Sequence, residues 1–400
     1  MVGSALRRSR LAGRTADIEP FRVVEVMEQA WALERTGRSI IRLCVGEPDF
    51  PSPPAVVAAG QRALRDGDVH YTSSLGLPPL REAISDYYDE RFGIDVPSRQ
   101  VVITTGASGA LLLALAATVD RDDEVLLADP GYPCNRHMIR TMEGRARPVA
   151  VDQTTAYQLT ASLVDRCWDD TTTAVLAATP SNPTGTVIPP AELAAIADVV
   201  HQRDGVMYVD EIYGELVYDG PPVTVLSHTD SPFVVSSCSK TFAMTGWRIG
   251  WMVCPSWALD AVEALAQNLY ISPPAPSQWA ALAAFTPEVW DVVDERRTEL
   301  RARREFLVGG LRHLGFGLPV VPPGAFYLYA DCSPFVGGPQ QPPDSAALAH
   351  HLLVEAGVAV TPGNDFGEHR AGTHLRFAYT TPIDRLAEAL DRIGRVLSSR

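Results

Sequence analysis

Residues 237–250 read SCSKTFAMTGWRIG. Two hydroxyl side chains, Ser237 and Ser239, stand beside the amine of Lys240, and Arg248 follows eight residues later. A lysine that loses its proton on burial can attack a carbonyl to form an imine, whereas a guanidinium binds phosphate through charge-assisted hydrogen bonds. The segment therefore predicts an amine nucleophile next to an anion-binding group.

Lys240 is the only lysine of the chain, since the other 33 of its 34 basic residues are arginine. A guanidinium stays protonated in proteins and cannot act as a nucleophile. The alternative is a lysine that persisted by chance at an indifferent surface position. The hydroxyls and the arginine around Lys240 favour the chemical interpretation.

Short β-branched runs alternate with amphipathic stretches on both sides of this segment. The runs expected to form buried strands are 101–105, 124–128, 173–178, 206–210, 233–236 and 249–253. Between them, residues 110–119 and 190–204 have the apolar spacing of helices, and the second stretch opens on a favourable proline. This alternation predicts an α/β fold with a mainly parallel sheet covered by helices.

The character of the sequence changes after Pro287. Residues 288–314 form a long, arginine-rich amphipathic pattern, which predicts a helix that leaves the first domain. Shorter patterns at 326–330, 345–356 and 375–379 predict a smaller α+β unit. We expect three parts: residues 1–50 as an N-terminal arm and part of the small domain, 51–287 as the large domain, and 288–400 as the small C-terminal domain.

Charge and composition disfavour several functional classes. The net charge of −14 argues against a nucleic-acid partner, which requires a basic face. The longest apolar run, Ala110–Val119, is too short to cross a membrane. The arginines near the start (Arg7, Arg8, Arg10 and Arg14) precede no apolar stretch of a secretory signal. Six scattered cysteines without a CxxC pair, and no histidines at ligand spacing, predict reduced thiols in a cytoplasmic protein without a metal site.

Further chemically useful residues follow two of the expected strands. The turn Gly106-Ala107-Ser108 opens a helix, where backbone N–H groups favour a phosphate. Asp210 ends the strand at 206–210, and Tyr213 comes three residues later. An aspartate there is often a helix cap or an ion-pair partner, but beside an aromatic nitrogen cofactor it would keep a pyridinium protonated. Because open α/β sheets bind ligands at the carboxyl ends of their strands, these residues are expected to share one site.

Residues 237–250 resemble the cofactor-lysine motif of the class I aminotransferases, the family with the aspartate aminotransferase fold. Further motifs of that family occur in the same order along nearly the whole chain: GEPDF at 46–50, Tyr71 before GLP at 76–78, GAS at 106–108, DPGYP at 129–133, SNPTG at 181–185, GAFY at 324–327, PG at 362–363, and Arg376. The resemblance implies a fold type I pyridoxal-phosphate-dependent transferase. That fold has a large domain, whose mainly parallel mixed sheet is sandwiched by helices, and a smaller α+β domain.

The resemblance also implies how the cofactor, pyridoxal 5′-phosphate, would be used. Lys240 would hold it as a Schiff base and shuttle the proton between the substrate Cα and the cofactor. Asp210 would keep the pyridine nitrogen protonated, and Tyr132 would stack on the ring. Tyr213 and Asn182 would bond the phenolic oxygen.

Two further groups of residues receive roles from the same resemblance. The phosphate would be held by Ala107, Ser108, Ser237, Ser239, Arg248 and the partner subunit's Tyr71. The last of these implies a homodimer with shared active sites. The substrate would be bound by Gly46, Asn182 and Arg376, with the planar fork of Arg376 on its α-carboxylate.

Recognition of the substrate side chain is the least determined part. In one bacterial branch that this chain resembles, a lysine in the phosphate turn pairs with the distal carboxylate of aspartate, but here Ser108 stands in that place. The other known solution, an arginine of the partner subunit, would fall within 269–277, which contains no arginine. We therefore expect a neutral or aromatic L-amino acid as donor rather than aspartate, with 2-oxoglutarate or pyruvate as the 2-oxo acid. Any distal carboxylate would have to be met by Arg22, Arg136 or His137.

Other functions stay open on the same fold. One is an aspartate aminotransferase, and another is a C–S lyase or a related β-eliminating, decarboxylating or cyclopropane-forming enzyme that uses the same electron sink. A binding module, such as the aminotransferase-like half of a transcription regulator, would need a DNA-binding segment. The residues before Gly46 leave no room for a winged helix.

Overall fold

The structure is a computed structural model that describes residues 11–398. Of the basic residues near the start, Arg7, Arg8 and Arg10 lie outside the described residues, and Arg14 lies in a short 3-10 helix, η1 (Gly13–Asp17). Within the described part of the chain, no helix is both long and apolar enough to span a membrane.

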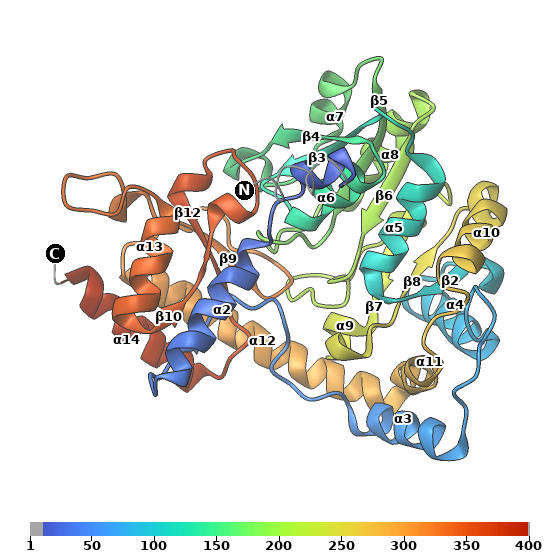
Figure 1. Ribbon diagram of the computed structural model, residues 1–400, viewed down its shortest axis with the longest axis horizontal. Coiled ribbons are helices and arrows are strands. Elements are labelled where there is room, and N and C mark those ends of the chain that lie inside the picture. Colours follow the sequence, from blue (N-terminus) through green and yellow to red (C-terminus); the bar gives the residue numbers. More distant parts are fainter. Residues whose placement is uncertain (1–10, 399–400) are drawn as a thin grey trace, which may run out of the picture.

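A seven-stranded sheet forms the centre of the larger part of the molecule (Figure 1). Its strands, in spatial order, are β2 (Val101–Thr104), β8 (Gly250–Val253), β7 (Phe233–Ser237), β6 (Val206–Asp210), β5 (Thr172–Ala178), β3 (Glu124–Asp129) and β4 (Arg145–Ala150). Only β8 runs antiparallel to its neighbours, and the other pairs are parallel. The expected fold class, a mainly parallel sheet sandwiched by helices, is confirmed.

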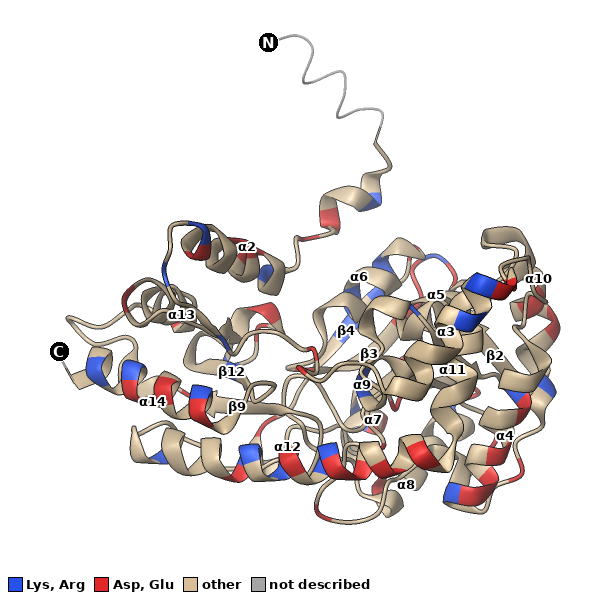
Figure 2. Cartoon of the chain, turned by 90° about the horizontal axis from the view of Figure 1, so that it is seen from below, with Lys and Arg blue, Asp and Glu red and all other residues tan. Residues whose placement is uncertain are grey.

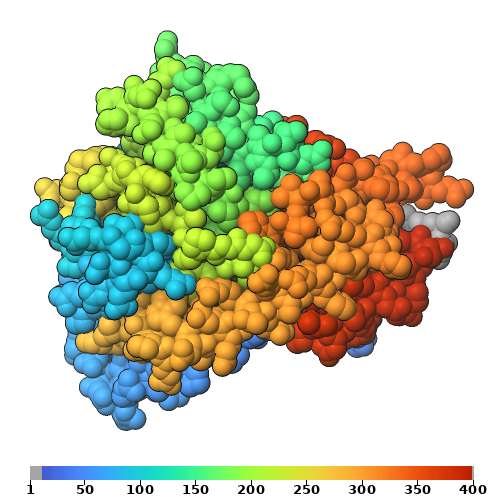
Figure 3. Space-filling model, turned by 180° about the vertical axis from the view of Figure 1, so that it is seen from behind, coloured from blue at the N-terminus to red at the C-terminus, as the bar shows by residue number. Residues whose placement is uncertain are grey.

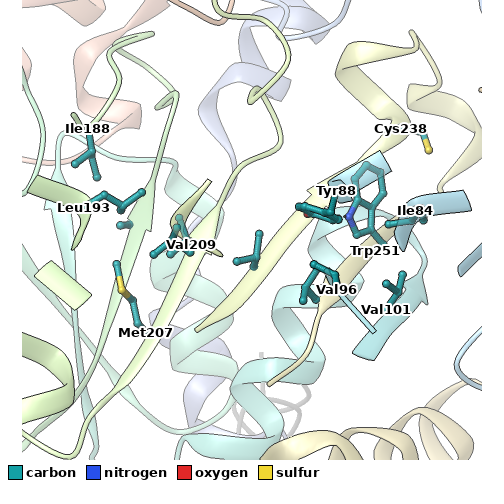
Figure 4. Packing of buried hydrophobic residues seen from close by; sticks show 14 of the residues in the cluster. Ile84, Tyr88, Val96, Val101, Ile188, Leu193, Met207, Val209, Cys238 and Trp251 are labelled. Carbon is teal, nitrogen blue, oxygen red and sulfur yellow. Dashed lines mark hydrogen bonds between the residues drawn. The ribbon is translucent and has the colours of Figure 1, made fainter. Parts of the chain in front are cut away.

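Both faces of this sheet are buried, because consecutive strand residues enter different apolar clusters. In β2, Val101 and Ile103 belong to one cluster and Val102 to the other, as the alternation of side chains along a strand requires. Figure 4 shows part of the first cluster, where Leu193 lies beside the strand residue Val209 and Tyr88 lies beside Trp251. The helices of this larger part are α3 (Pro54–Asp66), α4 (Pro78–Phe92), α5 (Gly106–Thr118), α6 (Pro133–Thr141), α7 (Ala161–Cys167), α8 (Pro190–Gln202), α9 (Cys238–Thr241), α10 (Leu259–Leu269) and α11 (Ala275–Leu282).

A second, smaller unit is built around the antiparallel sheet β11-β12-β9. Its elements are β9 (Tyr327–Asp331), α13 (Ser345–His351), β10 (Val358–Ala359), β11 (Thr361–Pro362), β12 (His374–Ala378) and α14 (Ile383–Ser398). The N-terminal part of the chain joins this unit, because β1 (Ile41–Arg42) pairs with β10 and α2 (Arg22–Arg35) contacts β10 and β11. Figure 1 shows α2, in blue, beside these orange and red elements.

One helix, α12 (Pro287–His313), belongs to both parts of the molecule. Val289 and Val293 lie in the core of the large sheet, whereas Leu300 and Leu307 lie in the core of the smaller unit. In Figure 3 its light-orange residues extend between the blue N-terminal helices and the red C-terminal ones. Figure 2 shows charges of both signs along it. Because α12 joins both cores, the domain bounds 1–50, 51–287 and 288–400 stay a prediction.

Candidate active site

A cavity of about 260 Å³ opens at the carboxyl ends of the parallel strands, where Ala178 ends β5 and Asp210 ends β6. This is the edge at which open α/β sheets bind ligands. The expected site residues that line the cavity are Gly46, Ala107, Ser108, Tyr132, Asn182, Asp210, Tyr213, Ser239, Lys240, Arg248 and Arg376. Residues from segments far apart in sequence therefore share one site.

Lys240 reaches this cavity from α9, a single helical turn after β7. Ser237 caps the turn, because its Oγ accepts a hydrogen bond of 3.0 Å from Ser239 N. The Lys240 Nζ donates a 2.7 Å hydrogen bond to the carbonyl oxygen of Gly46. Burial lowers the pKa of Lys240 to about 8, and the nearby positive charge of Arg376 also lowers it. A substantial fraction of this amine is therefore neutral, and nucleophilic, in weakly alkaline solution.

Asp210 is enclosed by protein except on the side that faces the cavity. Burial raises its pKa to about 6, although Ile212 N donates a 3.1 Å hydrogen bond to Oδ1. Tyr213 follows Asp210 by three residues, and its hydroxyl shares a 2.8 Å hydrogen bond with the hydroxyl of Tyr327. Asp210 thus supplies a buried carboxylate that lacks a cationic partner at hydrogen-bond distance among the described residues, and a cationic ligand atom would stabilise it.

Another part of the cavity wall, formed by Arg248 and the start of α5, suits an anion. Gly106 begins α5 with a φ of +77°, and a Cβ at this position would lie 2.7 Å from Nη2 of Arg248. Glycine therefore lets the guanidinium lie against the first turn of a helix, where unpaired N–H groups also point. Ala107 and Ser108 line the cavity in that turn. A guanidinium and a helix N-terminus together favour a phosphate.

Arg376 lies on β12 and is only 2% exposed. Its Nη1 donates to Asn182 Oδ1 at 2.7 Å, its Nη2 donates to the carbonyl oxygen of Cys44 at 2.6 Å, and its Nε has no partner among the described residues. The guanidinium lies over the rings of Tyr327 and Phe366, at 4.5 and 4.8 Å from their centroids. These contacts fix the orientation of a planar cation that matches a carboxylate.

Two expected residues lie outside the cavity. The hydroxyl of Ser237 is buried beneath it, donating to Ser239 Oγ at 2.8 Å and lying 3.0 Å from the carbonyl oxygen of Ile249. Tyr71 lies between α3 and α4 and is 80% exposed, so the cavity of one protomer does not include it.

The three residues proposed to meet a distal carboxylate, Arg22, Arg136 and His137, do not line the cavity either. Arg136 donates to the carbonyl oxygen of Asp365 from Nη1 and Nη2, at 3.3 and 3.2 Å. Among the described residues that line the cavity, the basic side chains are Lys240, Arg248 and Arg376.

The cavity wall also contains residues that sequence reasoning missed. Phe21, Val23, Asn135 and Met138 line it, as does Tyr327, which was recognised only as part of a motif. The ring of Phe21 meets that of Tyr132 edge-on, with centroids 6.0 Å apart. Apolar residues at a helix start carry no chemical signal in the sequence, so only the three-dimensional structure identifies them.

Comparisons with known proteins identify the family of this chain. The family model described as aminotransferase class I and II matches residues 38–393. Valine–pyruvate aminotransferase of Mycobacterium tuberculosis is 40% identical over 387 residues, which cover 96% of this chain and 98% of that protein. Aspartate/prephenate aminotransferase of Thermus thermophilus is 35% identical over 393 residues, covering 97% and 98%. The crystal structure of an aminotransferase from M. tuberculosis has a TM-score of 0.92 at 40% identity, covering 98% of this chain and 100% of that one.

Proposed function

This chain belongs to the class I and II aminotransferases, and we propose that it moves the amino group of a neutral L-amino acid to a 2-oxo acid, with pyridoxal 5′-phosphate as its cofactor. The observation that carries the proposal is the position of Lys240. The only lysine of the chain lies at the cavity with a pKa lowered to about 8.

The residues present suit this cofactor in three separate ways. The amine of Lys240 suits its aldehyde, the carboxylate of Asp210 suits a protonated pyridine nitrogen, and Arg248 with the first turn of α5 suits its phosphate. Tyr132 supplies an aromatic ring at the same cavity. When bound, the cofactor supplies an aldehyde for amines and a ring that accepts the electron pair left at the substrate Cα.

The chain's own groups then have distinct tasks. Lys240 would hold the cofactor through Nζ, and as a free amine it would move the proton at the substrate Cα. Asp210 would keep the ring nitrogen protonated, and Asn182 and Tyr213 would donate hydrogen bonds to the phenolic oxygen. Arg376 binds the α-carboxylate and so aligns the Cα–H bond with Lys240.

The basic side chains of the cavity explain why we propose a neutral donor. In this proposal Lys240 holds the cofactor, Arg248 binds its phosphate and Arg376 binds the α-carboxylate of the substrate. Phe21 and Val23 are apolar residues of the cavity wall. An unpaired distal carboxylate would cost several kcal/mol there. We propose pyruvate as the acceptor for the same reason, and the name of the M. tuberculosis relative, valine–pyruvate aminotransferase, supports both choices.

We also propose a cytoplasmic homodimer in which the partner subunit's Tyr71 reaches the phosphate. Tyr71 is exposed, and two apolar residues near it in the chain, Leu64 and Val69, are 64% and 50% exposed. Exposed apolar residues of this kind support the proposal that a second copy of the chain covers this surface. The domain division 1–50, 51–287 and 288–400 belongs to the same proposal.

Borohydride reduction followed by peptide mass mapping tests the role of Lys240. Reduction fixes the cofactor irreversibly to the amine that holds it, so the pyridoxyl mass should appear on the peptide containing Lys240. The matched control is Lys240→Arg, which keeps the charge but removes the nucleophile. A pyridoxyl label elsewhere, or an unlabelled Lys240 peptide in yellow protein, would contradict the proposal. Accumulation of keto acid from the donor without an aminated cofactor would indicate elimination instead.

A further inference from the structure

The start of α2 is held by a carboxylate from a distant part of the chain. Asp365 is 1% exposed, and its Oδ1 accepts a 3.0 Å hydrogen bond from the backbone N–H of Arg22, the first residue of α2. The residue before the helix, Phe21, provides no side-chain cap. Asp365 therefore acts as the cap that the local sequence lacks, and its negative charge suits a helix N-terminus.

The capped residue lies between two residues of the cavity wall. Phe21 and Val23, on either side of Arg22, both line the cavity, and Phe21 contacts the ring of Tyr132. The position of this wall therefore depends on where the first turn of α2 is held.

Asp365 is itself fixed by the larger part of the molecule. In the segment that follows it, Glu368 N and His369 N donate to Asp129 Oδ2 at 3.0 and 3.1 Å. Gly367 has a φ of +153°, and a Cβ there would lie 1.8 Å from Asp129 Oδ1. Gly131 N also donates to the carbonyl oxygen of Phe366 at 2.8 Å. The loop that carries Asp365 thus rests on the end of β3, beside Tyr132.

The arm before α2 has a second anchor, which is weaker. Arg140 Nε on α6 donates to Asp17 Oδ2 at 2.7 Å, but the two side chains are 34% and 55% exposed. Exposed ion pairs contribute little, whereas a buried charged acceptor contributes considerably more. Of these two polar anchors, Asp365 is therefore the stronger, and it lies directly at the residue between Phe21 and Val23.

We propose that Asp365 is a positioning residue for side-chain specificity, which holds the Phe21–Val23 wall against the side chain of the amino donor. This inference rests on the proposed function, because it assumes that the donor side chain meets that wall. Arg376 and Lys240 bind the groups common to all amino acids, so loss of the wall affects large donors more than alanine.

A double-mutant cycle in the cofactor-loaded enzyme tests the proposal. The quantity measured is the ratio of kcat/KM for the best branched or aromatic donor to that for alanine. Asp365→Ala and Phe21→Ala should each lower this ratio about tenfold. The double variant should show no further loss, because both changes remove one wall. Additive losses, or equal losses for alanine and the large donor, would overturn the inference.

Two variants separate positioning from a general effect on folding. Arg22→Pro removes the N–H that donates to Asp365 at 3.0 Å together with the exposed Arg22 side chain, and proline suits the first position of a helix. Phe21 already has the extended backbone, φ −79° and ψ 108°, that a following proline requires. Arg22→Pro should therefore lower the ratio as Asp365→Ala does. Asp17→Ala, at the weaker anchor, should leave it unchanged. An unchanged ratio in Arg22→Pro, or a tenfold loss in Asp17→Ala, would refute the role of Asp365.

Amide hydrogen exchange separates failure of this inference from failure of the proposed function. In the cofactor-loaded protein without substrate, Asp365→Ala and Arg22→Pro should speed exchange at residues 23–26 about tenfold or more. Unchanged exchange there would overturn the inference even if transamination of neutral donors is confirmed. A wild-type enzyme that transaminates no neutral amino acid would instead refute the proposed donor, while faster exchange would still support Asp365 as the cap.

Discussion

Asp210→Asn should stabilise the cofactor-free protein while it weakens the enzyme. The pKa of Asp210 is raised from 3.8 to about 6 by burial. Between these two values the folded state binds more protons than the unfolded state, so this group makes stability fall as pH rises through that window. The destabilisation is absent below the lower value and complete above the higher one. Asparagine has no charge to bury and keeps an oxygen for the N–H of Ile212.

The size of this effect follows from the shift. A rise from 3.8 to about 6 corresponds to about 3 kcal/mol of lost stability above neutral pH, and to about half of that near pH 5. The net shift already includes the attraction between Asp210 and Lys240 and the hydrogen bond from Ile212, both of which lower the pKa of the carboxyl. The free energy of unfolding of the variant should therefore exceed that of the wild type by up to about 3 kcal/mol near pH 8, and by less near pH 5.

Urea unfolding of the two cofactor-free proteins at several pH values measures this difference. The proteins must be compared at equal protomer concentration, because association adds to apparent stability. With cofactor present, the order should reverse: the variant should bind the cofactor more weakly and slow the half-reaction by several orders of magnitude, since a neutral pyridine is a poor electron acceptor. A variant that is less stable than the wild type without cofactor at every pH, or one with near-normal turnover, would refute the reasoning.

Three further predictions concern the substrate and the second subunit. Arg376→Lys should lower kcat/KM for amino donors by about a hundredfold or more. The reason is that lysine cannot reproduce the planar fork of the guanidinium or its position over the rings of Tyr327 and Phe366. Steady-state kinetics measures this effect, and a change of less than twofold would contradict it. In a donor panel, aspartate should have a lower kcat/KM than at least one neutral amino acid by about a thousandfold, and a profile led by aspartate and glutamate would disprove the neutral pocket. Mixing inactive Lys240→Ala subunits with impaired Tyr71→Phe subunits should give more activity than either variant alone, because one site of the heterodimer combines Lys240 and Arg376 of one chain with the partner subunit's intact Tyr71; a fully active monomer by light scattering would exclude a shared site.

The sequence predicted the sheet well where burial dictates composition. All six expected strands are present, within two residues at either end, because a strand that is covered on both faces is a continuous apolar run. It did not predict β4, which reads RARPVA. This strand lies at the edge of the sheet, where arginine and proline are tolerated, so it lacks the apolar signal.

The candidate site divides in a similar way. Residues that perform chemistry, such as Lys240 and Asp210, have side-chain types and spacings that restrict their roles, and the fold brings them to one cavity. Residues that shape the cavity carry no such restriction. The contact between Asp365 and Arg22 joins positions 343 residues apart, and no local pattern predicts it. Sequence reasoning therefore named the groups proposed to react, but it did not name Phe21 and Val23 of the cavity wall.

The continuity of α12 limits how the two parts of the molecule can move. Its 27 residues extend about 40 Å without a break, from the core of the large sheet to that of the smaller unit. Separating the two cores along this axis would break backbone hydrogen bonds in the middle of the helix. Rotation of the small unit about the axis of α12, or gentle bending of the helix, leaves these backbone hydrogen bonds intact. If the cavity opens and closes, the small unit should therefore rotate as a rigid body about the axis of α12. The displacement should be largest at the elements farthest from α12.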